Sequence, residues 1–340
     1  MWGDGHGKMN IAIMRIIHIS NENDKARVER VTRYMPDTFE YQYVIPNSEV
    51  MDADIIHAHG WFGCGQAANA QAAAKRIPYV VEVLQSDIQQ YHKHLIFNRK
   101  SYEQQLMEAA RVVFTTPSQE NFFAKHLPSK VADTVFAKST LLYEPLDTFW
   151  FDNLHIHPPT ALVHIKLLYV GALTGDSRIE ELLHAMRKLH RHNYEVSLTV
   201  VEDKVVEGSC QQKVLREAGK DDHLRVLPVG SDEELLEVYR HHDILWQPEA
   251  ESLQRYAEAL TQGLPVLYAH DSIADGIFKE GQAGYALNAS SSDEIARTIL
   301  NVSNFFGTIE QQSMRLHPLG QFDARELVRQ WEHLYRNITL

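Results

Sequence analysis

The sequence lacks several features that would place it in a specialised class of protein. It has two cysteines in 340 residues, Cys64 and Cys210, which lie too far apart to suggest a disulfide framework and fit a reducing compartment. No apolar run reaches the roughly 18 residues that a membrane span needs, and the opening residues, MWGDGHGKMN, contain no signal-peptide core. We therefore expect a cytoplasmic protein that touches a membrane, if at all, peripherally at its inner face.

Positive charge is also scarce. The chain has 33 lysines and arginines against 45 aspartates and glutamates, which gives a formal net charge of -12. This balance argues against nucleic acid as the main partner, because phosphate-backbone binding depends on basic side chains. Hydrophobic residues make up 44% of the chain and charged residues 23%, which is typical of an ordinary globular protein, and the length favours two domains.

Strands and helices alternate along most of the chain. Apolar, β-branched runs such as 14–20 predict buried strands, and the alanine-rich run 66–75 predicts a helix. This alternation indicates α/β domains with parallel sheets covered by helices on both faces. The proline-containing stretch 145–164 interrupts it and is expected to connect two domains, residues 14–144 and 165–320. Ligands are expected at the carboxyl ends of the strands.

Not every segment fits this alternation equally well. Two short runs near the end of the first domain, 134–137 and 140–143, are strand candidates. Asp52-Ala-Asp54 could be mistaken for a metal-binding pair, but it precedes a buried strand, so we interpret both acids as turn formers.

The stretch 246–267 joins a buried strand end to a helix. We expect the helix over residues 252–262, with Ser252 as its N-cap. A strand that ends at a helix N-terminus offers unpaired amides and a positive dipole to an anion. Glu251 and Glu258 flank this point and could bind sugar hydroxyls beside a phosphate. The alternative is that the acids only stabilise and solvate the helix N-terminus.

A second strand-to-loop stretch lies in the first domain. His57 and His59 alternate in the predicted strand 53–59, so they point to the same face. One of them could bind a ligand hydroxyl, or it could be a core histidine bonded to backbone, and the sequence leaves both open. Trp61, in the glycine-rich loop 60–65, could stack on a sugar ring if it is exposed. Two histidines without a third ligand do not predict a zinc site.

In order and spacing, these pieces resemble the retaining glycosyltransferases of family 4, the GT-B group that includes glycogen synthase and bacterial mannosyltransferases. The resemblance covers nearly the whole chain from Met14. The matching motifs are Asp54-Ile-Ile-His57-Ala-His59-Gly60, Ser86-Asp87, Leu168-Tyr-Val-Gly171, Glu258-Ala-Leu with Gly263-Leu-Pro-Val266, and residues 322–335. The resemblance implies two Rossmann-like domains facing a cleft, with a closing helix in residues 321–340 that packs back on the first domain.

The resemblance also implies a site. In such enzymes one carboxylate binds the ribose of the nucleotide, and another, with the amides after it, holds the donor sugar. A basic side chain stabilises the leaving diphosphate, so no metal or other cofactor is required. The implied catalytic residues are Glu251 and Arg178. The implied donor-binding residues are Gly171, Ser252, Leu253, Gln254 and Glu258. The implied acceptor-side residues are His57, His59, Gly60, Trp61, Ser86 and Asp87.

Four features depart from the family pattern. The two glutamates are seven positions apart instead of eight. Ala172 and Ser177 stand where two cations normally hold the diphosphate, which leaves Arg178 as the substitute. Losing one charge-assisted contact costs about 1.5–3 kcal/mol. Leu84 replaces a histidine near the donor sugar, and residues 21–27 replace a glycine pair after the first strand.

Three functions follow from the matches and departures together. The favoured one is retaining transfer of a sugar from a nucleotide diphosphate sugar, with a UDP-sugar favoured, to a glycan, lipid-linked or small-molecule acceptor in cell-surface polysaccharide or glycoconjugate synthesis. The second is a non-catalytic GT-B subunit that binds a glycan or a partner transferase, and the third is a nucleotide-sugar epimerase.

Residues 91–102, which mix cations with aromatics, could form a helix on an anionic membrane or a solvated helix with a buried stripe of apolar side chains.

Overall fold

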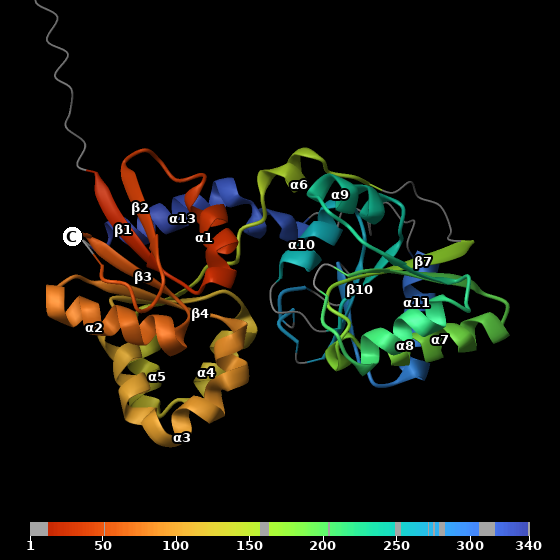
Figure 1. Cartoon of the computed structure of the whole chain (residues 1–340), viewed down its shortest axis with the longest axis horizontal. Helices are drawn as coiled ribbons and strands as arrows, with labels where there is room; N and C mark the ends of the chain where they lie inside the picture. Colours follow the sequence, from red (N-terminus) through yellow and green to blue (C-terminus); the bar gives the residue numbers. More distant parts are fainter. Residues whose placement is uncertain are drawn as a thin grey trace, which may run out of the picture. The chain divides into compact units, whose positions relative to one another are not determined.

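The chain folds into two α/β units, each built on its own six-stranded parallel sheet (Figure 1). The structure is a computed structural model that describes residues 13–50, 52–156, 163–202, 205–248, 253–270, 272–274, 276–278, 283–305 and 317–338. The first unit takes the chain through Thr115, then Phe123–Leu142, then the chain from Val328. The second takes Thr116–Phe122 and Tyr143–Leu327. The predicted fold class is confirmed.

The first sheet has the strand order β2-β1-β3-β4-β5-β6. Its strands are β1 (Met14–Ile19), β2 (Phe39–Val44), β3 (Ile55–His59), β4 (Tyr79–Val83), β5 (Arg111–Phe114) and β6 (Ser139–Leu141). The helices between them are α1 (Lys25–Thr32), α2 (Gln66–Lys75), α3 (Gln85–Glu108), α4 (Pro117–His126) and α5 (Ser129–Phe136). Strands β3 and β4 are buried along their whole length, as expected for parallel strands covered on both faces.

The second sheet has the strand order β12-β11-β10-β7-β8-β9. Its strands are β7 (His164–Val170), β8 (Glu195–Val201), β9 (Leu224–Leu227), β10 (Ile244–Trp246), β11 (Val266–Ala269) and β12 (Gly284–Leu287). Its helices are α6 (Thr148–Asp152), α7 (Ile179–Arg191), α8 (Ser209–Ala218), α9 (Asp232–Arg240), α10 (Gln254–Thr261) and α11 (Ser292–Phe305). Two buried clusters lie on its two faces, one against α7 and α11 and the other against α9 and α10.

Helix α13 (Ala324–Arg336) begins in the second unit and ends in the first. Its residues Trp331, Leu334 and Tyr335 are buried against Ile16 and Val80 of the first sheet, together with other apolar side chains. Figure 1 shows α13, in blue, beside the red strands β1 and β2. The predicted closing helix is therefore present, and it supplies part of the core of the first unit.

The structure corrects one local prediction and adds detail to another. Residues 134–137 do not form a strand, because Val131 and Val135 are one helical turn apart and bury one face of α5. The stretch 145–164, expected to be a connection, contains the helix α6, whose Trp150 is buried in the second unit; residues 157–162 lie outside the described part of the chain. None of the described helices is both long enough and apolar enough to cross a membrane.

Candidate functional site

The loop after β7 is shaped by a glycine. Gly171 has φ +156°, and a Cβ at this position would lie 2.9 Å from Tyr169 Oη. That hydroxyl donates to the carbonyl of Ala172 at 2.7 Å. A side chain at position 171 would displace the tyrosine, so the glycine lets the chain turn tightly at the carboxyl end of the sheet. Here the structure places the predicted Gly171 at a strand end, as the resemblance implies.

The turn that follows is braced by hydrogen bonds. Ser177 is buried; its hydroxyl donates to the carbonyl of Thr174 at 2.7 Å, and its own carbonyl accepts from Trp246 Nε1 at 2.9 Å. Cys210 Sγ also donates to the Thr174 carbonyl, at 3.2 Å. The serine that replaces a family lysine is therefore a structural member of this turn, and it could not be exchanged for a long cation without rearrangement.

Arg178 ends the turn and opens α7. Its backbone lies in the left-handed region, with φ +50°, which is uncommon for a non-glycine residue. Its side chain is 42% exposed and stands 3.4 Å from a carboxylate oxygen of Glu181. An ion pair this exposed is weak, so the guanidinium can exchange its partner for a ligand anion.

The helix expected over residues 252–262 begins later than predicted. Helix α10 starts at Gln254, and Leu253 rather than Ser252 occupies the N-cap position. Leu253 is buried in the core of the second unit, which fixes the last residue before the helix. The predicted residues Glu251 and Ser252 lie outside the described residues, so their roles stay predictions.

Glu258 is fully buried on α10. Its Oε1 accepts from Gln254 Nε2 at 2.7 Å, and its Oε2 accepts from Arg255 at 2.7 Å and from Tyr239 Oη at 3.0 Å. Burial raises the pKa of this carboxyl, while Arg255 and the two other donors oppose the shift. Both carboxylate oxygens are thus engaged by protein groups, and a ribose would have to displace at least one of them.

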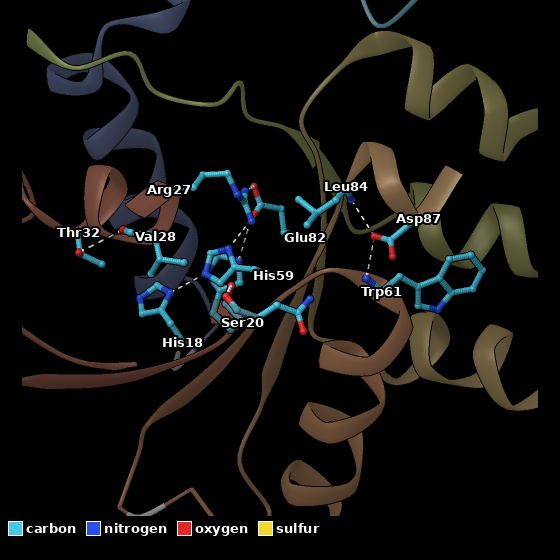
Figure 2. Close-up of polar contacts among 12 residues, drawn as sticks. His18, Ser20, Arg27, Val28, Thr32, His59, Trp61, Glu82, Leu84 and Asp87 are labelled. Atoms are coloured by element: carbon cyan, nitrogen blue, oxygen red, sulfur yellow. Dashed lines mark hydrogen bonds and ion pairs between the residues drawn. The ribbon is translucent and has the colours of Figure 1, made fainter. Parts of the chain in front are cut away.

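In the first unit, four polar side chains gather on one face of the sheet, at the carboxyl ends of three strands. His18 and His57 are register partners in β1 and β3, and His59 and Glu82 are register partners in β3 and β4. Register partners point to the same side of a sheet, as do residues two apart in a strand. The prediction that His57 and His59 share a face is therefore confirmed, and Figure 2 shows His59 in contact with both His18 and Glu82.

These side chains form one hydrogen-bonded cluster. His59 Nδ1 donates to Glu82 Oε2, and His59 Nε2 lies 2.8 Å from His18 Nδ1. Arg27, from α1, donates to Glu82 Oε1 at 2.6 Å. Burial is the main cause that lowers the pKa of His18, to about 3, and it also lowers the pKa of His57 and His59. The histidines are therefore neutral at physiological pH.

The cluster decides between the two interpretations of His57 and His59. Both are fully buried, so neither presents a nitrogen to solvent for an acceptor hydroxyl. They are core histidines, but their partners are side chains rather than backbone: Tyr335 Oη lies 2.7 Å from His57 Nδ1. His18 and Glu82 were not among the predicted site residues. The sequence pattern that could have identified them is a polar residue near the carboxyl end of each of two largely apolar strands, β1 and β4.

The glycine-rich loop is held by Asp87. Its carboxylate accepts backbone N–H groups from Trp61 at 2.9 Å and Leu84 at 2.8 Å (Figure 2). It also accepts the backbone N–H of Phe62 at 3.1 Å. Burial raises the pKa of Asp87 to about 6, opposed by these backbone donors. Gly60, with φ +115°, makes the turn possible. Asp87 thus has a structural function in this loop.

Two other predicted acceptor-side residues can be placed. Trp61 is fully buried, and its Nε1 donates to the carbonyl of Tyr102 at 3.1 Å. The idea that it stacks on a sugar is therefore wrong for this structure, because its ring packs against Phe123 and other core aromatics. Ser86 is exposed on the first turn of α3. Asp54, which was interpreted as a turn former before the strand, accepts a hydrogen bond from the backbone N–H of Arg15 at 2.7 Å.

Comparison with protein families matches residues 160–304 to the model described as Glycosyl transferases group 1. The match lies within the second unit, so residues 160–304 are similar to a glycosyl transferases group 1 domain. No curated protein matches the sequence. The matched residues contain β7, the braced turn with Arg178, and α10 with Glu258, whereas the histidine cluster lies outside them.

Solved structures share the fold at low identity. HepE from Anabaena, in complex with UDP, is 12% identical with a TM-score of 0.74, over 96% of this chain and 100% of that chain. Sucrose-phosphate synthase from Thermosynechococcus elongatus is 14% identical with a TM-score of 0.70, over 95% and 98%. A putative UDP-N-acetylglucosamine 2-epimerase from Listeria monocytogenes is 12% identical with a TM-score of 0.61, over 94% and 95%. The group 1 domain therefore belongs to a chain with the GT-B fold.

Proposed function

We propose that the chain transfers a sugar, with retention, from a nucleotide diphosphate sugar to a glycan, lipid-linked or small-molecule acceptor. The observation that carries the proposal is the group 1 match at residues 160–304, in which the hydrogen-bonded turn after β7 is followed by Arg178 at the start of α7. A UDP-sugar is the favoured donor, a choice supported by the UDP complex of HepE. The favoured setting remains synthesis of cell-surface polysaccharide or glycoconjugate.

The chemistry needs charge stabilisation more than acid or base groups. Retention requires the acceptor oxygen to bond the anomeric carbon on the face from which the diphosphate leaves, and the acceptor proton passes to the leaving phosphate oxygen. The partly exposed Arg178 guanidinium can pair with the developing diphosphate charge, and such preorganised electrostatic stabilisation is usually the largest catalytic contribution. Glu251 remains the proposed partner of the donor sugar, and no metal ion is needed for this step.

Calorimetric titration with UDP, GDP and ADP tests the proposal. We expect UDP to bind, and Arg178→Ala to raise the Kd for UDP about 10- to 100-fold, which corresponds to the loss of one charge-assisted contact. The affinity for uridine should stay unchanged, because the nucleoside has no phosphate. Arg187→Ala is the matched control, since Arg187 lies on the same helix, is similarly exposed and pairs with Glu217. Equal losses for UDP and uridine would show that Arg178 does not touch the diphosphate.

One observation favours a second candidate, a non-catalytic GT-B subunit that binds a glycan or a partner transferase. Both oxygens of Glu258 are occupied by protein donors, and Ala172 and Ser177 supply no cation. If none of the three nucleotides binds, this candidate replaces the transferase. If UDP binds, incubation with UDP-N-acetylglucosamine and no acceptor separates transfer from epimerisation, because only an epimerase would then convert the sugar of the nucleotide sugar to its epimer.

A further inference from the structure

Three histidines of the first sheet hold their ring nitrogens close together. One nitrogen each of His18, His57 and His59 lies within 4.8 Å of the others, and all three side chains are buried. The spacing is set by strand register rather than by loops, since His18 pairs with His57 across β1 and β3 and His59 is two residues further along β3. The arrangement is therefore rigid before any ligand binds.

Two of these rings are already oriented in the manner of metal ligands. His59 Nδ1 donates to the carboxylate of Glu82, and His57 Nδ1 is bonded to Tyr335 Oη. Metal-binding histidines typically use one nitrogen for the ion and the other for such an outer partner. This leaves the Nε2 atoms of His57 and His59 as the ligand atoms.

Some buried nitrogens in the cluster have no hydrogen-bond partner. Within the described part of the chain, His18 Nε2 and His57 Nε2 are both buried and unpaired. Buried polar atoms are nearly always satisfied in folded proteins, and His57 Nε2 is the unpaired atom that faces the other two rings. A cation between the rings would give His57 Nε2 the partner that it lacks.

We propose that His18, His57 and His59 bind a divalent transition metal ion, with Zn²⁺ favoured, and that Glu82 and Tyr335 orient two of the rings. Three neutral imidazoles are a ligand set that zinc uses. Two nitrogens on one tetrahedral zinc stand roughly 3.3 Å apart, close to the 2.8 Å that separates His18 Nδ1 from His59 Nε2. On binding, the proton on His18 Nδ1 moves to Nε2 of the same ring, so that Nδ1 can bind the ion and all three imidazoles stay neutral.

One carboxylate faces the cluster, and an arginine paired with it offsets part of its charge. Glu82 Oε2 lies 3.9 Å from His57 Nε2, near enough to lower the cost of the buried positive charge. Arg27 already pairs with the other carboxylate oxygen at 2.6 Å, so the carboxylate is fixed in place. Because Tyr335 belongs to α13, an ion here would fasten that helix to β1 and β3. The site is a structural one, built within the first unit.

Metal content and thermal unfolding test the proposal on the full chain. The protein is unfolded with a chelator, refolded with or without Zn²⁺, and analysed by mass spectrometry for bound metal. We expect about one Zn²⁺ per chain, a higher Tm with the ion, and visible absorption bands when Co²⁺ replaces it. His18→Gln should lose the ion and the bands. Tyr335→Phe should keep the ion with about 10- to 100-fold weaker affinity.

The control is a buried histidine of the second unit. His242 bonds the Val238 carbonyl through Nδ1, so His242→Gln disturbs a core without touching the cluster and should keep one ion. The proposal is overturned if wild-type protein refolded with Zn²⁺ holds no more ion than His18→Gln, or if His242→Gln loses the ion equally. If His18→Gln does not fold, Tyr335→Phe decides, and an unchanged zinc affinity in that variant overturns the proposal.

Discussion

Glu82 and Glu258 are two buried glutamates, one in each unit, and each accepts a short hydrogen bond from an arginine. Their partners differ in origin. Glu82 is bonded to Arg27 and His59, which lie 55 and 23 residues away, whereas two of the three partners of Glu258 lie within one turn of the same helix. The first glutamate thus joins α1, β3 and β4, and the second mainly completes α10.

The arginines that pair with these two glutamates also differ in their exposure to solvent. The Arg27 side chain is 11% exposed and the Arg255 side chain is 23% exposed. If its glutamate were neutralised, Arg255 could turn towards water more easily than Arg27. A buried charge that loses its partner and cannot reach water is among the most costly defects in a protein, so the same substitution should have different effects in the two units.

The largest effect is expected for Glu82→Gln. In the metal-free protein this change leaves the Arg27 charge without its carboxylate, so we expect the free energy of unfolding to fall by about 3–5 kcal/mol. Urea unfolding measures it. Glu40→Gln, at an exposed position on strand β2 of the same sheet, is the control and should change stability by less than about 0.5 kcal/mol. A similar loss in both variants would mean that the cluster does not stabilise the first unit.

The next effect depends on pH and concerns Asp87. Its pKa is raised to about 6 in the folded protein, mainly by burial. A raised carboxyl pKa means that the folded state holds its proton more tightly, so the contribution is present below the ordinary pKa and is lost as pH rises through 6. Asp87→Asn should therefore be most destabilising near pH 4 and up to about 3 kcal/mol less so at pH 7.

Urea unfolding between pH 4 and pH 7 measures this dependence. Asp37→Asn, an exposed position in the same unit, is the control and should run parallel to wild type. A stability difference between wild type and Asp87→Asn that stays constant with pH would contradict the prediction.

The smallest effect is expected for Glu258→Gln. Glutamine can still accept from one or two of the three donors, and Arg255 has access to water, so we expect a loss of about 1–3 kcal/mol. Glu237→Gln, which breaks only an exposed pair with Arg240, provides the baseline in the same urea assay. If Glu258→Gln costs as much as Glu82→Gln, the contrast between a long-range and a local network is wrong.

Much of the architecture could be predicted because the spacing of apolar residues along the sequence indicates helices and strands. The helix over 66–75 has the bounds that the sequence predicted. The strand prediction for residues 134–137 was wrong because a short apolar run fits a strand or a helix equally well. The helix is identified only by Val131 and Val135, which lie one helical turn apart.

The sites were harder to predict than the elements. His18 and Glu82 meet only through pairing with β3, which spacing along the chain does not reveal. Trp61 looked suitable for sugar stacking because its glycine-rich loop suggested exposure, but the loop folds its ring into the core. Ser177 was interpreted as a lost cation, whereas the structure shows a buried side chain that braces the turn before Arg178.

The path of α13 has a consequence for the order in which the protein can be made. The ribosome synthesises β1 to β6 long before residues 328–338, yet Trp331 and Tyr335 cover Ile16 and Val80 in the finished sheet. Until then the nascent first unit presents an apolar sheet face and the uncapped His57 ring to the cell. We expect that this unit, expressed alone without the late helix, is prone to aggregate and is recovered when residues 324–338 are supplied as a separate peptide.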